Sequence, residues 1–148
     1  MEKIIKEVQT KEDIQNLLES FTPYLGSLSS GSVDKAALAE KYHKYAKVVV
    51  LYEETQLAGF GCFYCNDTQS RTAFLSLIAV LPCHQRKGYG NMLLSEVISI
   101  AKKEGMKQIE LEVKKKNPGA IQFYQKYGFS IMEKETETSV FMWLAFQQ

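Results

Sequence analysis

The sequence lacks the features that mark several large classes of protein. No apolar run approaches the length of about 20 residues that a membrane helix needs. The first seven residues, MEKIIKE, lack the apolar core of a signal peptide, so we expect a cytoplasmic protein that does not bind membranes. Only three cysteines are present, Cys62, Cys65 and Cys83, and so small and odd a set argues against a disulfide framework.

The chain also lacks a strong charge of either sign. Lys and Arg number 18 against 17 Asp and Glu, which argues against nucleic acid as a partner. The run at residues 114–116 is three lysines without interleaved aromatic residues, a pattern more typical of a solvated loop than of a nucleic-acid site. With 148 residues, 45% of them apolar, and no repeat or low-complexity tract, we expect one domain over residues 1–148.

What the sequence does contain is a mixed pattern of helices and strands. Strands are predicted at residues 4–8, 47–52, 57–65, 73–81, 107–113, 129–132 and 139–146. Helices are predicted after Thr10, after Ser32, from Tyr89 and after Asn117, because each start has a capping residue or a glycine turn. The polar turns predicted at 53–55 and 66–71 make strands 47–52, 57–65 and 73–81 successive antiparallel partners. The last of these is apolar almost throughout, so we expect it to be buried on both faces.

The stretch Gln85–Gly90 lies between this apolar strand and an amphipathic helix. Its two glycines let backbone N–H groups approach a ligand, and the helix N-terminus favours an anion there. It is not a dinucleotide-binding fingerprint, because the third glycine position is Leu93, and the chain contains no P-loop. The segment alone is therefore either an anion-binding turn or a tight turn whose glycines serve geometry only.

Two separated motifs carry a resemblance to a known family. Gln85, Gly88 and Gly90 match the pattern Gln/Arg-x-x-Gly-x-Gly/Ala, and a second pattern, Asn-x-x-Ala-x-x-Phe-Tyr-x-x-x-Gly-Phe, matches about thirty residues downstream. The residues of the second match are Asn117, Ala120, Phe123, Tyr124, Gly128 and Phe129. In both motifs the chain resembles the GCN5-related N-acetyltransferases. The likeness covers about residues 73–129, and the first 70 residues match only in the order of their elements.

The resemblance implies an α/β fold: a single domain with a mixed, mostly antiparallel sheet, flanking helices and a split between strands four and five. It implies acetyl-CoA as cosubstrate in that split, with the pyrophosphate on backbone N–H groups of residues 86–90. The peptide-like pantetheine arm would pair with Ile78 and Val80 as an added strand does. The full set expected to bind the cofactor is Ile78, Ala79, Val80, Gln85, Arg86, Lys87, Gly88, Tyr89, Gly90, Asn91, Asn117, Ala120, Phe123 and Tyr124.

The resemblance also assigns catalytic roles. Tyr124 matches the general acid of the family, although a tyrosine on an amphipathic helix can equally be a core aromatic. The Ile78 N–H is the expected oxyanion donor. Many members carry a glutamate on the fourth strand, but this chain has Phe74 there. Glu112 looks like the glutamate of the ribosomal-protein N-acetyltransferase branch, and it is either the general base, acting through water, or a solvated surface carboxylate.

The implied function is transfer of an acetyl group from acetyl-CoA to the primary amine of a small molecule, such as an amino sugar, amino acid or polyamine. Acetylation of a peptide or protein N-terminus, and a CoA-binding module without transfer activity, are the alternatives. We expect the N-terminal helices, with Phe21, Tyr24, Tyr42 and Tyr45, and the final hairpin to shape the acceptor pocket. No metal site is expected, because Cys62 and Cys65 point to opposite faces of a strand and no second pair exists. The final hairpin leaves edge strands through which a homodimer could form.

Overall fold

The structure is a computed structural model that describes residues 2–26 and 33–147, and in it the strands form one seven-stranded sheet in the order β1-β2-β3-β4-β5-β7-β6. The strands are β1 (Lys3–Glu7), β2 (Lys47–Glu53), β3 (Gln56–Asp67), β4 (Thr72–Val80), β5 (Gln108–Lys114), β6 (Ser130–Glu135) and β7 (Ser139–Ala145). Every neighbouring pair is antiparallel except β4 and β5, which run parallel. The predicted α/β class and the mostly antiparallel sheet are confirmed.

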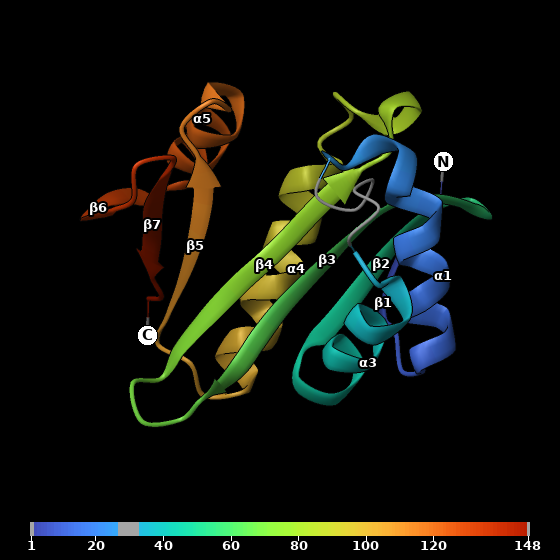
Figure 1. Ribbon diagram of the computed structural model, residues 1–148, viewed down its shortest axis with the longest axis horizontal. Helices are drawn as coiled ribbons and strands as arrows, with labels where there is room; N and C mark the ends of the chain where they lie inside the picture. Colours follow the sequence, from blue (N-terminus) through green and yellow to red (C-terminus); the bar gives the residue numbers. More distant parts are fainter. Residues whose placement is uncertain (1, 27–32, 148) are drawn as a thin grey trace.

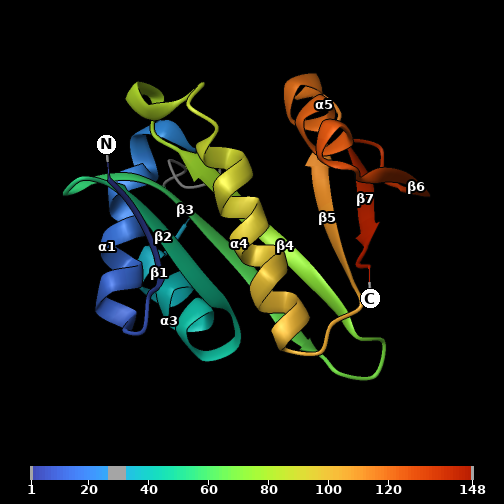
Figure 2. The ribbon, with the colours of Figure 1, turned by 180° about the vertical axis from the view of Figure 1, so that it is seen from behind.

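Helices cover both faces of the sheet (Figures 1 and 2). On one face α1 (Lys11–Phe21) and α3 (Lys35–Tyr45) bury a cluster that contains Leu18, Phe21 and Phe60. On the other face α4 (Tyr89–Lys103) buries a cluster that contains Leu93, Ile109 and Met142, and α5 (Pro118–Tyr127) packs against the same cluster. Two short 3₁₀ helices, η1 (Thr22–Tyr24) and η2 (Pro82–His84), lie in the connections. We call the face covered by α1 and α3 the α1/α3 face, and the face covered by α4 and α5 the α4 face.

Local capping chemistry explains where most helices begin. The side chains of Thr10 and Asn117 accept hydrogen bonds from the third backbone N–H of their helices, as predicted. For the second helix the prediction of Ser32 as the cap falls outside the described residues. The described cap is Asp34, whose side chain accepts from the Ala37 N–H at 3.1 Å, so α3 begins at Lys35. In the described part of the chain, no helix is long and apolar enough to cross a lipid bilayer.

Two predictions about the strands are wrong. The turn predicted at residues 53–55 is only Glu54 and Thr55, because Glu53 is the last residue of β2 and pairs with Gln56. Glu53 is 6% exposed. Strand β4 is not buried on both faces, since Phe74 is 37% exposed and Ser76 is exposed. Both lie on the α1/α3 face, where α3 packs mainly against β2 and β3 and leaves this part of β4 open.

The sheet opens between β4 and β5. Their parallel pairing runs from Thr72 opposite Gln108 to Leu75 opposite Leu111 and ends there. At this point β4 carries a bulge, because Cys62 of β3 pairs with Leu77 while Phe63 pairs with Leu75, which leaves Ser76 as the extra residue. The bulge bends β4 away from β5, and the two strands diverge toward their carboxyl ends (Figure 1). The split expected between the fourth and fifth strands is present.

Candidate functional site

The connection from β4 to α4, residues 81–88, lies at the open end of the split (Figure 1). Arg86 has φ 65° and Gly88 has φ 81°, while Lys87 between them is not among the positive-φ residues. This alternation of hands turns successive N–H groups toward one side, a geometry that binds anions elsewhere. Helix α4 follows at once, with Gly88 as a cap that offers no side chain, so no side chain of the described residues caps the N–H groups of its first turn.

A pocket of about 260 Å³ lies over these N–H groups. Eight of the nine residues that line it belong to the predicted cofactor set, and the ninth is His84. The eight predicted residues are Val80, Gln85, Arg86, Gly88, Tyr89, Gly90, Asn91 and Phe123. The structure therefore brings the end of β4, the connection and α5 together around one hollow.

Gly90 explains how α5 reaches this hollow. A Cβ at Gly90 would lie 3.3 Å from the ring of Phe123, so the absence of a side chain lets the start of α4 approach the middle of α5. Gln85 has a bracing role, because its Nε2 donates to the Val80 carbonyl at 3.1 Å and ties the connection to β4. The side-chain oxygen of Asn117 accepts from the Ala120 N–H at 3.1 Å, so Asn117 caps α5 and Ala120 lies in its first turn.

The remaining predicted residues of β4 lie along the split. Ile78, Ala79 and Val80 follow the bulge, beyond the last residue that pairs with β5. Ile78 and Val80 pack toward the α4 face, while the Ala79 side chain is buried in the α1/α3 cluster, so Ala79 offers a ligand only its backbone. These three residues place an unpaired strand edge along the opening, which an extended amide-bearing ligand could join.

Tyr124 lies on α5 with its ring on the α4 face. The ring packs edge-on against Phe123, with ring centroids 5.1 Å apart, and against Phe129 at 5.5 Å. Burial raises the pKa of Tyr124 to about 12, so the phenol keeps its proton throughout the physiological range. Within the described residues its hydroxyl has no hydrogen-bond partner. A protonated donor without a partner is therefore present where the resemblance expects a general acid.

Glu112 lies on the opposite face of β5. Ile109, Leu111 and Val113 face the α4 cluster, and strand alternation turns Glu110 and Glu112 to the α1/α3 face. Glu112 is exposed and pairs across the sheet with Phe141. Glu112 and Tyr124 thus flank the sheet from opposite sides, and only a ligand lying in the split between β4 and β5 could meet both.

A larger pocket, about 580 Å³, opens on the α1/α3 face beside the bulge. Its lining comes from α3 and the turn before it, and from β4, and comprises Val33, Asp34, Ala37, Leu38, Lys41, Tyr42, Ser76 and Leu77. The Tyr42 hydroxyl lies 3.3 Å from the Ser76 hydroxyl, and burial raises the pKa of Tyr42. Of the four aromatic residues expected at an acceptor pocket, only Tyr42 lines this one. Phe21 is a core residue whose ring packs edge-on against Phe60, while Tyr24 and Tyr45 are 56% and 52% exposed.

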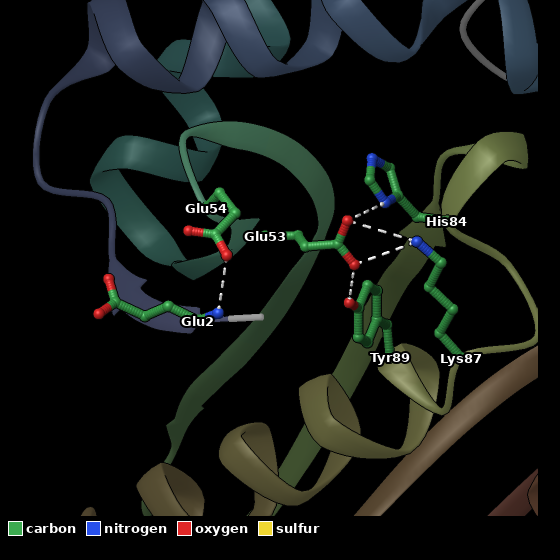
Figure 3. A network of polar contacts seen from close by, with 6 residues as sticks. All are labelled: Glu2, Glu53, Glu54, His84, Lys87 and Tyr89. Carbon is green, nitrogen blue, oxygen red and sulfur yellow. Dashed lines mark hydrogen bonds and ion pairs between the residues drawn. The ribbon is translucent and has the colours of Figure 1, made fainter.

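A buried polar cluster behind the connection was missed by the sequence analysis (Figure 3). The Glu53 carboxylate accepts hydrogen bonds from the Lys87 ammonium at 3.1 and 3.3 Å and from the Tyr89 hydroxyl, and it lies 3.6 Å from Nδ1 of His84. The hydrogen bond from Tyr89, followed by that from Lys87, lowers the pKa of Glu53, and the same bond raises the pKa of Tyr89 to about 12. No signal in the sequence pairs Glu53 with residues 31–36 positions away.

Cys62, Cys65 and the lysine run do not line the candidate cofactor pocket. Cys62 belongs to the α1/α3 cluster and Cys65 packs on the α4 cluster, so the two thiols lie on opposite faces as predicted. Burial raises the pKa of both thiols, to about 11 for Cys65. Across the described residues, no three His, Cys, Asp or Glu side chains come together as metal ligands. The lysine run is solvent-exposed, and Lys115 forms a surface ion pair with Glu135 at 3.0 Å.

Comparison with known proteins points in one direction. The family model described as "Acetyltransferase (GNAT) family" matches residues 11–129. An uncharacterised N-acetyltransferase, CgeE, of Bacillus subtilis is 36% identical over 109 residues, which are 70% of this chain and 42% of that protein. The ribosomal protein bS18-alanine N-acetyltransferase of Escherichia coli is 34% identical over 79 residues, 53% of each chain. The chain spans about half the length of the curated relatives it matches.

Solved structures share the whole fold at low sequence identity. The E. coli bS18-alanine N-acetyltransferase superposes with a TM-score of 0.80 at 21% identity, covering 99% of this chain and 96% of that one. The PaiA N-acetyltransferase of Thermoplasma acidophilum, solved in complex with coenzyme A, gives a TM-score of 0.79 at 21% identity, covering 99% and 100%. Both support the overall fold described above.

Proposed function

Because the chain belongs to the acetyltransferase (GNAT) family, we propose that it transfers an acetyl group from acetyl-CoA to a primary amine by direct attack on the thioester. The observation that carries the proposal is the split itself. Along it lie the connection with its positive-φ residues 86 and 88, the edge of β4 at residues 78–80 that β5 does not pair, and the protonated Tyr124 of α5. These are the parts that a pyrophosphate, a pantetheine arm and a departing thiolate each require.

The cofactor occupies the split in this proposal. Its pyrophosphate lies on the N–H groups of residues 86–90, where the helix N-terminus also favours negative charge. Arg86 is exposed and makes no ion pair with any described residue, so its guanidinium is available to a phosphate. The pantetheine arm extends along residues 78–80, and this course brings the thioester toward the bulge, where the pocket of the α1/α3 face begins.

The chemistry then follows from the two faces. The neutral amine approaches from the α1/α3 face and its nitrogen attacks the thioester carbonyl carbon, so that a C–N bond forms. The Ile78 N–H donates to the developing oxyanion, a role worth about 3 kcal/mol in other enzymes. As the C–S bond breaks, Tyr124 donates its proton to the thiolate sulfur, and the proton lost by the amine passes through water to Glu112. The products are the acetamide and CoA with a free thiol.

The raised pKa of Tyr124 is compatible with this role. A phenol that titrates near 12 is a weak acid in water, but the same dry surroundings raise the pKa of the departing thiol as well. Because the phenol is protonated at every physiological pH, each cofactor molecule that binds meets a hydrogen-bond donor. The proton therefore passes over a short path once negative charge develops on sulfur.

Two acceptor classes have specific support. A pocket of about 580 Å³ beside the bulge favours a small-molecule amine, since this volume suits a compact ligand. The printed names of two relatives, the bS18-alanine N-acetyltransferase and an N-alpha-acetyltransferase 50 of Danio rerio at 35% identity, favour a peptide N-terminus. The small amine is our first proposal and the peptide N-terminus our second.

One assay tests the activity and separates the acceptors. Release of CoA thiol from acetyl-CoA would be followed over a panel of amino sugars, amino acids, polyamines and short peptides with free N-termini, and the product identified by mass spectrometry. Acceptor-dependent turnover is expected, with Tyr124→Phe as the control that removes it. Cofactor binding without turnover on any amine would identify a CoA-binding module instead, and the proposed transfer would be wrong.

A further inference from the structure

The side chains that contact Glu53 in the buried cluster all come from one segment, which a cluster that only stabilises the fold does not require. All three side chains that face the carboxylate, His84, Lys87 and Tyr89, come from the β4–α4 connection or the first residue of α4. In the described residues no partner of the Glu53 side chain comes from β1, β3 or α1, the elements around it in the fold. Glu53 lies at the end of β2, and its described side-chain contacts are made only with the connection and the first residue of α4 (Figure 3).

The segment that Glu53 contacts holds two residues at positive φ. Arg86 has φ 65°, a conformation that is strained for a non-glycine residue, and Gly88 has φ 81°. Lys87 lies between them, and its ammonium is fastened to both oxygens of Glu53. Tyr89 follows Gly88 with its ring 2% exposed and its hydroxyl on the same carboxylate. The two contacts thus fix the residues on either side of Gly88 and, with them, the directions of the N–H groups.

The two cationic side chains of the connection, Arg86 and Lys87, differ in whether they form an ion pair. Lys87 is engaged by Glu53, whereas Arg86 is exposed and forms no ion pair in the part of the chain that the structure describes. Both cations were expected to bind the cofactor. Of the two, only Arg86 is without an ion pair among the described residues, so Arg86 is the one free to contact a ligand.

We propose that Glu53 is a positioning residue for cofactor binding: it holds the residue 86–90 N–H groups in their anion-binding arrangement before acetyl-CoA arrives. The inference rests on the proposed function, because the anion it invokes is the pyrophosphate of CoA. Its effect belongs to binding and to the phosphate end of the cofactor, and the reacting atoms lie elsewhere along the split.

The sign of the effect follows from two opposed contributions. Glu53 is an anion near an anion site, so its removal lessens repulsion, but Lys87 already balances that charge at 3.1 Å. Removal also frees the connection, and each hydrogen bond from a preorganised N–H to a charged group that is lost weakens binding about tenfold or more. The loss of preorganisation is the larger contribution, so binding should weaken.

The test compares Glu53→Gln with Glu54→Gln. Glu54 is the adjacent carboxylate, exposed on the turn, and its side chain accepts a hydrogen bond from the Glu2 N–H instead of contacting the connection (Figure 3). Both variants lose one negative charge at nearly the same place. The dissociation constant of CoA would be measured by titration calorimetry, and that of pantetheine, which lacks the pyrophosphate, by NMR titration.

We expect Glu53→Gln to bind CoA about tenfold more weakly while its affinity for pantetheine stays within about twofold, and Glu54→Gln to match the unmodified protein for both. Equal CoA affinity in the two variants would overturn the inference, as would a parallel loss for CoA and pantetheine, which signifies a general change of fold. If the unmodified protein bound no CoA, the proposed function would itself be wrong and the inference with it.

Tyr89→Phe keeps the test decisive if Glu53→Gln does not fold. The phenylalanine retains the buried ring and removes only the hydroxyl that donates to Glu53. The same selective weakening of CoA against pantetheine is expected, by a smaller factor. A Tyr89→Phe protein that folded and bound CoA as the unmodified protein does would contradict the role assigned to the cluster.

Discussion

The α4 face and the α1/α3 face of the sheet are built in different ways around the same split. On the α4 face, the candidate cofactor pocket is lined by the β4–α4 connection, the first turn of α4 and Phe123 of α5, and Figure 2 shows both helices on this face. On the α1/α3 face, helices cover β2 and β3 but leave Phe74, Glu112 and Trp143 at the surface. Helices cover the strands near the split on the α4 face. The α1/α3 face, which we call the open face, leaves strand side chains at the surface.

This difference corresponds to the different requirements of the two proposed ligands, the cofactor and the acceptor amine. A cofactor with a constant phosphate and pantetheine structure can be bound by backbone N–H groups and strand edges. Residues of many types can supply these groups, provided that the backbone has the right conformation. An acceptor must be distinguished by its own chemistry, and side chains such as Lys41 and Tyr42 line the pocket proposed for it. Variants on the two faces should therefore change different kinetic constants.

The largest effect is expected on the α4 face, at the general acid. Tyr124→Phe keeps the packing against Phe123 and Phe129 and removes the proton donor. We expect kcat to fall about 100-fold or more with little change in the KM for acetyl-CoA, because general acid catalysis is typically worth this much. Steady-state kinetics with saturating amine measures both constants.

Tyr127→Phe is the matched control for that variant. Tyr127 lies on the same helix, and its hydroxyl lies 2.9 Å from the Ser95 hydroxyl, away from the split. It should keep nearly the full kcat. If Tyr124→Phe were as active as Tyr127→Phe at every pH, Tyr124 would be a packing residue and the α4 face would contribute binding only.

The second effect concerns the backbone that closes the α4 face. A Cβ at Gly59 would lie 2.7 Å from the Ala79 carbonyl oxygen and 3.0 Å from Leu93, so β3, β4 and α4 meet there without room for a methyl group. Gly59→Ala should lower the free energy of unfolding by about 1–3 kcal/mol, measured by urea denaturation. Gly119→Ala is the control.

Gly119 lies in α5, where the nearest atom to a new Cβ is 3.8 Å away. Alanine is a better helix former than glycine, so Gly119→Ala should leave stability unchanged or raise it by up to about 1 kcal/mol. A Gly59→Ala protein as stable as Gly119→Ala would show that the close approach of β3 to β4 does not hold the α4 face together.

The two faces also differ in how much of them was predictable. On the α4 face the signals are local: Gly88 precedes a helix, Asn117 and Pro118 start another, and Gly128 ends it. Short-range chemistry of this kind can be interpreted from neighbouring residues, and the structure places eight of the predicted cofactor residues around one pocket. The alternating pattern of residues 107–113 likewise predicted which side of β5 is buried.

What was not predicted depends on contacts between distant segments. Glu53 follows an apolar strand and precedes a polar turn, so nothing local shows that its carboxylate is buried against His84, Lys87 and Tyr89. The exposure of Phe74 depends on where α3 packs, and an apolar run does not reveal which part of it a helix will cover. The pocket of the α1/α3 face is set by the same packing.

A third and smaller effect tests the open face. Glu112→Gln should reduce the rate at neutral pH about tenfold, because water can partly replace a solvated base. The rates of the two proteins should converge at high pH, where hydroxide can accept the proton that the attacking amine loses. Since Glu112 is exposed, the melting temperature should not change.

Glu110→Gln is the control for the base, since Glu110 lies two residues earlier on the same strand and the same face. It should retain the activity of the unmodified protein. Full activity of Glu112→Gln at neutral pH would leave Glu112 as a surface carboxylate, and the open face would then contribute an acceptor pocket without a base.

The smallest effect is expected where the open face meets the bulge. Tyr42→Phe removes the hydroxyl that lies 3.3 Å from Ser76, a neutral contact worth about 1 kcal/mol, and keeps the buried ring. Measured with the amine that the acceptor panel identifies, the acceptor KM should rise about fivefold while the KM for acetyl-CoA is unchanged. An equal rise in both constants would mean that the bulge transmits changes across the sheet, in which case the two faces act as one site.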